Sequence, residues 1–256
     1  MRAVAGNAGR YLPPAFGFLC LVSAAVIIEG LLRAGVLNRF IVPLPTEIMA
    51  SFGRLFGEEH LMTRFLATLQ ECFYAMVALA LIGIPIGVLL YQMPLLRKAT
   101  ETWISALASA PIVLMYPLFL VIFGRSAATI IVMGVIAGLP PLILKTIEGL
   151  SGTRQSLVNV GRSFRLTRSQ MITKIMLPSA LPTIFVGLRL GLIFALINIV
   201  GVEFLINFGG LGQLINDLAE RYDMAGMYAT IVFVVLVSVL FFIVTERLEQ
   251  WLRRAS

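Results

Sequence analysis

The sequence predicts an all-α protein, a polytopic bundle that crosses a membrane about six times. Hydrophobic residues make up 59% of its 256 residues, whereas soluble domains contain roughly 45–50%. Several apolar runs reach the length of about 20 residues that a helix needs to cross the hydrocarbon core of a bilayer. Charged residues are only 13% of the chain and gather between these runs. We therefore expect one transmembrane domain, residues 1–256, and no separate soluble domain.

Each predicted span carries its own local signal. The first holds Glu29 and Arg33, whose spacing of four allows a neutralised pair near the end of the span, although an ion-pair function stays open. The second and fifth contain glycines four residues apart, which let helices approach closely. The third is broken by Pro111 and Pro117, and prolines 140 and 141 lie near the end of the fourth. The predicted spans are residues 16–36, 65–91, 103–123, 128–144, 184–206 and 227–245.

Two of the outer connections are predicted to hold short amphipathic helices. In residues 38–64, Thr46 is expected to cap a helix that lies in the membrane interface. In residues 207–226, a glycine turn precedes a helix from Leu211 to Tyr222.

The distribution of lysine and arginine predicts the orientation. Most of them lie in the two tails, in residues 92–102 and in residues 145–182, whereas the opposite side of the spans has few. By the positive-inside rule, both termini and the long basic loop are expected to be cytoplasmic in a multi-pass protein of the cell inner (plasma) membrane. The basic residues predicted outside are Arg39, Arg54, Arg64, Arg125 and Arg221.

The basic loop, residues 146–182, is predicted to fold into two short helices. In the first, Leu157, Val160 and Phe164 recur with spacings of three and four, so they share one face. The second, residues 169–177, has a similar apolar face, and Pro178 is expected to end it. A solvated loop that only fixes the topology is the alternative, but the apolar faces favour docking onto the bundle or onto a partner protein.

The sequence disfavours an enzyme and offers no cofactor or metal site. It contains no nucleotide-binding GxxxxGK[ST] loop, no GxSxG elbow and no HExxH motif. Its only histidine is His60, and its two cysteines, Cys20 and Cys72, lie within apolar runs. Any ATP hydrolysis would therefore take place on another chain.

Three residues within the spans are candidates for a transport path. Pro111 and Pro117 free backbone carbonyl groups and kink the third span, as in bundles that change shape. Glu203 is an acid inside the fifth span, and such acids usually face a bundle interior or a water-filled path. A hydrogen bond to a neighbouring helix near the outer interface explains Glu203 equally well.

The basic loop resembles the EAA loop of permease subunits of ATP-binding-cassette importers. The resemblance extends to VPLPTEI at 42–48, GIPIG at 83–87, LPSALP at 177–182, GLRLGL at 187–192 and GGLG at 209–212, and is closest to the nitrate/sulfonate/taurine branch. It departs from the family pattern Glu-x-Ala-x-x-x-Gly at Asn159, Gly161 and Arg165. Arginine in place of the turn glycine is expected to take another conformation or to shift the turn.

What the resemblance implies is a permease that pairs with a second permease subunit, identical or not. The EAA-type helix docks on cytoplasmic ATP-binding subunits, and an extracytoplasmic solute-binding protein delivers a small, anionic organic solute. The alternatives are a standalone channel or ion-coupled carrier and a structural subunit without a transport path. The implied ATPase-contact residues are Leu157, Asn159, Val160, Gly161, Arg162, Phe164 and Arg165.

Overall fold

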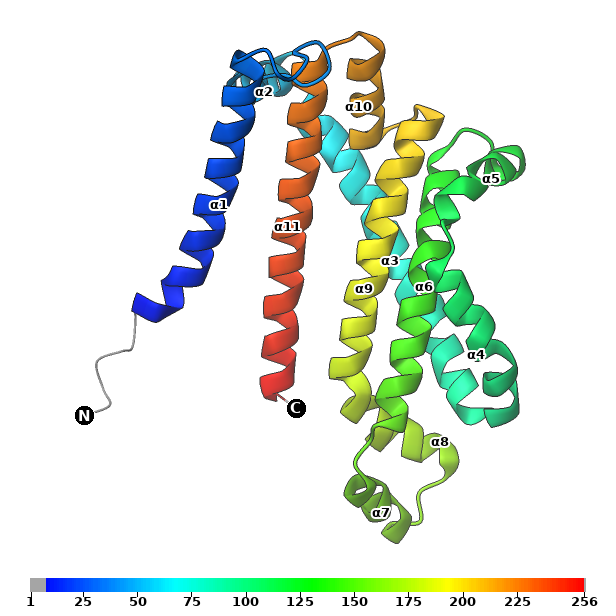
Figure 1. Ribbon diagram of the computed structural model, residues 1–256. Coiled ribbons are helices and arrows are strands. Elements are labelled where there is room, and N and C mark those ends of the chain that lie inside the picture. Colours follow the sequence, from blue (N-terminus) through cyan, green and yellow to red (C-terminus); the bar gives the residue numbers. More distant parts are fainter. Residues whose placement is uncertain (1–7, 256) are drawn as a thin grey trace, which may run out of the picture.

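The computed structural model describes the backbone of residues 8–255, and the side chains of residues 16–17, 19–247 and 250. All regular elements in this part of the chain are helices (Figure 1), so the predicted all-α class is confirmed. Long helices run between two ends of the molecule. We call the end that carries α7 and α8 the basic end, and the end that carries α2 and α10 the opposite end.

The helices follow the sequence closely except at the third span. Their bounds are α1 (Ala8–Arg33), α2 (Pro45–Gly57), α3 (Leu61–Gln92), α4 (Pro94–Ser109), η1 (Ile112–Met115), α5 (Tyr116–Phe123), α6 (Ala127–Ser151), α7 (Gln155–Ser163), α8 (Arg168–Met171), η2 (Ile172–Met176), α9 (Leu177–Ile206), α10 (Gly210–Glu220) and α11 (Met224–Ala255).

The predicted number of about six spans is not exact for the residues that the structure describes. Within the described residues, four helices are long and apolar enough to cross a membrane: Leu61–Gln92, Ala127–Ser151, Arg168–Ile206 and Met224–Arg247. Among the same residues, a fifth span is obtained when α4 and the η1–α5 pair are counted together, and these are bent by 90° at Pro111. The bend follows from proline chemistry, because proline lacks the backbone donor and disfavours a helical residue before it.

The centre of the bundle is built from α3, α6 and α9, which pack at their glycines. A Cβ atom added at Gly138 of α6 would lie 2.5 Å from the carbonyl oxygen of Gly191 in α9. In the same way, a Cβ atom at Gly83 or Gly87 of α3 would overlap side chains of α6. The predicted small-residue contacts are therefore present, and they bring the helix backbones close together.

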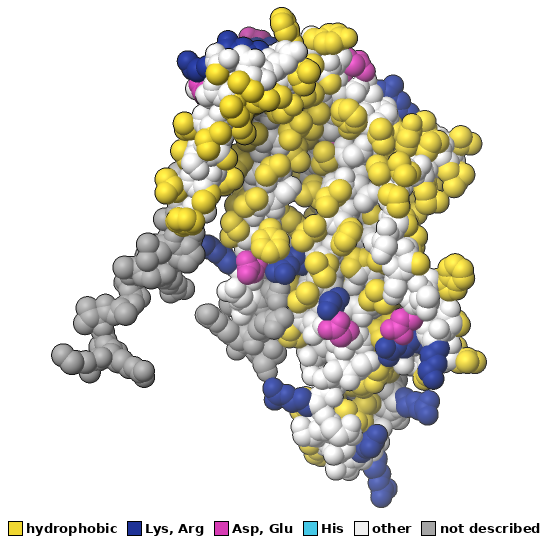
Figure 2. Space-filling model, viewed as in Figure 1, with side chains coloured by type: hydrophobic (Ala, Val, Ile, Leu, Met, Phe, Trp, Pro, Cys, Tyr) yellow, Lys and Arg dark blue, Asp and Glu magenta, His cyan; other side chains and the backbone are white. Residues whose placement is uncertain are grey.

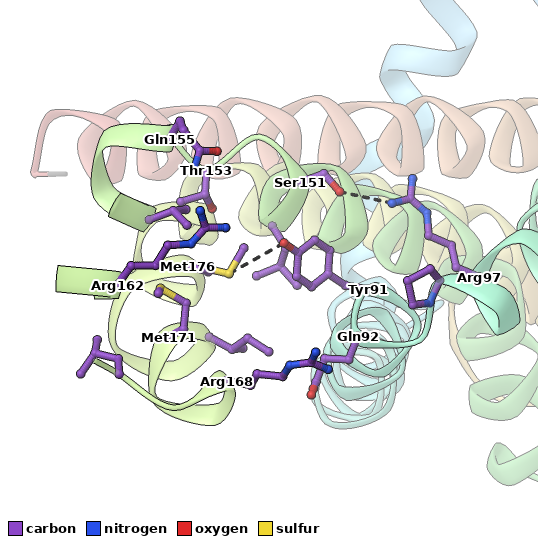
Figure 3. A pocket seen from close by; sticks show the side chains of 15 residues that line it. Tyr91, Gln92, Arg97, Ser151, Thr153, Gln155, Arg162, Arg168, Met171 and Met176 are labelled. Atoms are coloured by element: carbon purple, nitrogen blue, oxygen red, sulfur yellow. Dashed lines mark hydrogen bonds between the residues drawn. The ribbon is translucent and has the colours of Figure 1, made fainter. Parts of the chain in front are cut away.

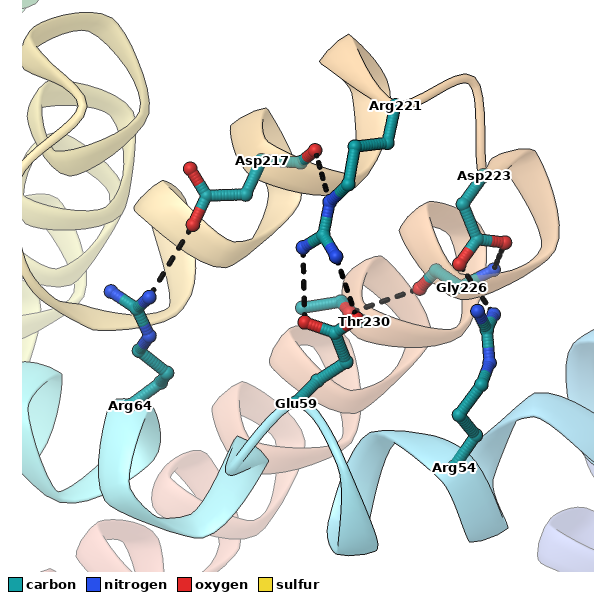
Figure 4. Close-up of polar contacts among 8 residues, drawn as sticks. All are labelled: Arg54, Glu59, Arg64, Asp217, Arg221, Asp223, Gly226 and Thr230. Carbon is teal, nitrogen blue, oxygen red and sulfur yellow. Dashed lines mark hydrogen bonds and ion pairs between the residues drawn. The ribbon is translucent and has the colours of Figure 1, made fainter.

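The opposite end is tied together by polar contacts between helices that are far apart in the sequence (Figure 4). Arginines at positions 54, 64 and 221 pair with acids from different elements, and α1 is joined to α2 where Thr46 donates to Glu29 at 3.2 Å. The predicted Glu29–Arg33 pair is present at 2.5 Å. The three inter-element ion pairs are Arg54–Asp223, Arg64–Asp217 and Arg221–Glu59.

Two local predictions are wrong. Thr46 does not cap α2, because the helix begins one residue earlier, at Pro45, with Leu44 as the cap residue. The Glu47 carboxylate accepts the Leu44 amide proton at 3.0 Å instead. Pro178 does not end a helix either. It follows the π-turn η2 directly, within a helical run that continues from α8 into α9.

Apolar side chains cover much of the visible surface between the two ends (Figure 2), and lysine and arginine side chains gather at the basic end. This banding is what a bilayer requires of the surface around it, with cationic groups at the level of the lipid headgroups. The chain is therefore a multi-pass membrane protein.

Candidate functional site

Helix α7 projects an apolar ridge from the basic end. Leu157 is 40% exposed, Val160 51% and Phe164, which caps the helix, 76%. The opposite face of α7, which includes Val158 and Arg162, turns toward the rest of the chain. Three apolar side chains on one exposed helix face form the kind of surface that is covered in an assembly.

Two of the three residues that depart from the family pattern, Gly161 and Arg165, lie where α7 meets the segment that leads into α8. Gly161 is buried, and a Cβ atom there would lie 2.6 Å from Cδ1 of Ile175 and 2.7 Å from Cε of Met171. Arg165 has φ of +53°, and its amide donates to the carbonyl of Arg162 at 2.9 Å. The expectation of another conformation or a shifted turn is wrong, because the arginine adopts the left-handed conformation itself, at a cost of about 1–2 kcal/mol.

The remaining predicted residue of α7, Asn159, is exposed and accepts a hydrogen bond from the side chain of Gln155 at 3.1 Å. It therefore belongs to neither the ridge nor the contact around Gly161.

The helical run that follows α7 reaches a span without a break, because α8, η2 and α9 are continuous from Arg168 to Ile206. After α8, the chain forms one turn of π-helix, η2, and continues directly into α9. Thr167 starts this run as a capping residue, and its hydroxyl accepts the Gln170 amide proton at 3.3 Å. Through Gly161, α7 therefore packs against Met171 and Ile175 of the helical run that leads into α9.

The candidates Pro111 and Pro117 lie at and just after the 90° bend. Pro111 precedes the 3₁₀ turn η1, and Pro117 stands in the first turn of α5, so it begins that helix and does not break it. Among the described side chains of α4 and α5 none is buried. This bent segment is held to the bundle by the buried Ile112 of η1, and apolar residues such as Trp103, Leu118 and Val121 are exposed on the single chain.

Glu203 is fully buried near the opposite end of α9 and joins three helices. Its Oε1 accepts a hydrogen bond from the Thr68 hydroxyl of α3 at 2.7 Å, and its Oε2 accepts one from the Gly212 amide of α10 at 2.7 Å. The Thr68 hydroxyl in turn accepts the Leu211 amide proton at 2.8 Å. This geometry corresponds to the hydrogen-bonded alternative for Glu203, and its role in a path stays a prediction.

The junction explains the GGLG sequence at 209–212. A Cβ atom at Gly210 would overlap the Glu203 carboxylate and the Thr68 hydroxyl, and one at Gly212 would overlap the carbonyl oxygen of Val200. Sequence reasoning did not assign Thr68 a role. A threonine in an apolar span has an available donor, but only the fold shows that its partner lies 135 residues away.

Comparisons with known proteins agree with this architecture. A family model described as "Binding-protein-dependent transport system inner membrane component" matches residues 80–254. The glycine betaine/proline betaine transport system permease protein ProW of Escherichia coli (strain K12) is 31% identical over 75% of this chain. The chain spans about half of the length of that relative, 52%.

A second relative and a solved structure extend the comparison. The putative aliphatic sulfonates transport permease protein SsuC of Bacillus subtilis (strain 168) is 27% identical, over 80% of this chain and 74% of that protein. A structure entitled "Inward facing conformations of the MetNI methionine ABC transporter" has a TM-score of 0.65 at 23% identity. It covers 75% of this chain and 95% of that one, and it shows that the fold is shared.

Proposed function

The chain belongs to the family of inner membrane components of binding-protein-dependent transport systems, and from this membership we propose that it is the permease subunit of an ATP-driven importer. Its spans form the translocation path, and a separate ATPase drives it. The exposed ridge of Leu157, Val160 and Phe164 is the observation that carries this proposal. It lies on a short helix joined to the spans, where an ATPase subunit can both bind and push.

Two other surfaces support the contacts that we propose with the remaining partners, a second permease subunit and a solute-binding protein. The bent α4–α5 segment, with exposed apolar side chains such as Trp103, Leu118 and Val121, is the proposed contact for a second permease subunit. Pro111 and Pro117 then lie beside the path between the two subunits. The basic end faces the cytoplasm, with both termini, and the α2–α10 end receives the solute-binding protein.

The proposed solute is a small organic anion of the sulfonate or taurine kind. This assignment is supported by the Bacillus subtilis relative, which is named a putative aliphatic sulfonates transport permease protein. Selection of the individual solute is assigned to the binding protein.

The experiment compares Phe164→Asp with Phe164→Leu in proteoliposomes that contain the permease, its ATPase and its binding protein. Full burial of a phenylalanine contributes about 1.5–3 kcal/mol, so loss of the apolar ring should weaken the ATPase contact by about tenfold or more. We expect Phe164→Asp to insert normally but to lose ATP-driven uptake, whereas Phe164→Leu keeps most of it.

Two results would count against the proposal. Uptake that is unchanged in Phe164→Asp would show that the ridge does not couple to an ATPase. Solute flux through the permease alone, without ATPase or ATP, would favour a channel or an ion-coupled carrier.

A further inference from the structure

A cavity of about 740 Å³ opens at the basic end, on the side of α7 that faces away from the ridge. It lies between the ends of α3 and α6, the start of α4 and the α7–α8 pair (Figure 3). Because the spans α3 and α6 end here, the cavity lies at the level where lipid phosphate groups meet a membrane protein.

Three arginines from three different elements line the cavity: Arg97 of α4, Arg162 of α7 and Arg168 of α8. Arg97 is paired with Glu101 of its own helix at 3.0 Å. Within the described part of the chain, no hydrogen bond or ion pair reaches the guanidinium group of Arg162 or Arg168. None of the described residues that line the cavity is an aspartate or a glutamate, so the positive charge of the cavity is not balanced by its own lining.

Neutral hydrogen-bonding groups complete the lining. The Ser151 hydroxyl accepts a hydrogen bond from Arg97 at 3.3 Å, which leaves its own proton to donate. The hydroxyl oxygen of Thr153 is buried and has no partner among the described residues. Figure 3 shows Ser151, Thr153 and the arginines arranged around the same cavity. A buried hydroxyl without a partner is costly unless a ligand supplies one.

We propose that this cavity binds a phosphate group, either in the headgroup of an anionic phospholipid or in a soluble phosphate. Guanidinium groups bind phosphate oxygens in a planar, two-pronged geometry, and these bonds are among the stronger ones in proteins. The apolar part of the lining, which includes Leu150, Met171 and Met176, accommodates the carbon portion of a lipid.

The proposed site also has a regulatory consequence that goes beyond transport itself. A phosphate that contacts Arg162 and Arg168 would connect α7 with α8, and it would lie between this helix pair and the ends of α3 and α6. The ridge stays free, because Leu157, Val160 and Phe164 lie on the other face of α7. Occupancy of the cavity would therefore set how firmly α7 is held, and the bound phosphate would not compete with a partner protein for the ridge.

The test uses the full-length chain purified in a neutral detergent, without ATPase or binding protein, so it does not depend on the proposed transport function. Isothermal titration calorimetry is carried out with short-chain phosphatidylglycerol and, separately, with inorganic pyrophosphate. The double variant Arg162→Gln/Arg168→Gln is compared with the wild type. The matched control is Arg154→Gln, an exposed arginine of the same loop that does not line the cavity.

We expect saturable binding of at least one probe and a dissociation constant that rises about tenfold or more in the double variant. The control should stay within about twofold of the wild type, and unfolding without probe should be unchanged. Binding of phosphatidylglycerol but not of pyrophosphate assigns the site to a lipid headgroup. Binding of pyrophosphate, with or without phosphatidylglycerol, assigns it to soluble phosphates. The single variant Arg162→Gln serves if the double variant does not fold.

Two outcomes would overturn the proposal. One is the absence of saturable binding of either probe to the wild type. The other is equal binding by the wild type and the arginine variants, which would place any bound phosphate elsewhere on the chain.

Discussion

Replacement of Thr68 by valine tests whether hydrogen bonds hold the Glu203 junction together. The valine keeps the overall shape of threonine but loses the hydroxyl group, which donates to Glu203 at 2.7 Å and accepts from the Leu211 amide at 2.8 Å. Thr68, Glu203 and Leu211 are all buried, so water cannot replace the lost bonds. A buried polar group without its partner costs about 1–3 kcal/mol, and with partial relaxation we expect a total loss of about 2–4 kcal/mol.

The measurement is unfolding by sodium dodecyl sulfate in mixed micelles, followed by circular dichroism. The matched control is Thr230→Val, since Thr230 is also buried but donates only to the Gly226 carbonyl of its own helix, at 2.9 Å. That carbonyl keeps its place in the helix, so the control should lose less than about 1 kcal/mol. Thr68→Ser should restore most of the stability. Equal losses in the two valine variants would refute the reasoning.

Three further predictions concern stability. Arg165→Gly should raise the free energy of unfolding by up to about 1 kcal/mol, because glycine adopts a φ of +53° without strain; a decrease in the same denaturation would contradict this. Gly138→Ala should cost about 1–3 kcal/mol, because its methyl group meets the backbone of Gly191, whereas Gly161→Ala meets only flexible side-chain ends and should cost less; the reverse order would be evidence against the packing described. Glu59→Gln should cost less than about 1 kcal/mol, and this cost should shrink in about 1 M salt, since Arg221 is half exposed. The hydrogen bond to Glu59 raises the pKa of Arg221 further above its ordinary value. The ion pair therefore contributes its full stabilisation at any pH below the ordinary pKa of arginine. A rise to about pH 10 should not weaken it, and denaturation at two pH values checks this.

The features that the sequence predicted well are those set by neighbouring residues. The spans in α3, α6, α9 and α11 follow from long apolar runs, and the ridge follows from the spacing of Leu157, Val160 and Phe164. Arg165 shows the limit of such reasoning. The turn position was recognised, but nothing local indicated that an arginine would accept the left-handed conformation in place of glycine.

The features that the sequence did not predict depend on angles and on distant partners. Proline at 111 signalled a break, yet the 90° angle is set by how the two segments pack. Pro178 gave the same signal and was misread, because the preceding π-turn lets the chain enter α9 with proline in its first turn. The hydroxyl of Thr68 and the cavity around Arg162 both need elements from separate parts of the chain, and no periodicity within one segment contains that information.

The close approach of Gly138 and Gly191 decides how the bundle can move. The helices α6 and α9 touch through their backbones at these glycines, and they precede and follow the α7–α8 pair in the chain, so we expect them to move together as one unit. A displacement of α7 would then move α6 and α9 together and would not separate them. The helices α4 and α5, none of whose described side chains is buried, are then expected to change position more easily than the closely packed α6–α9 pair.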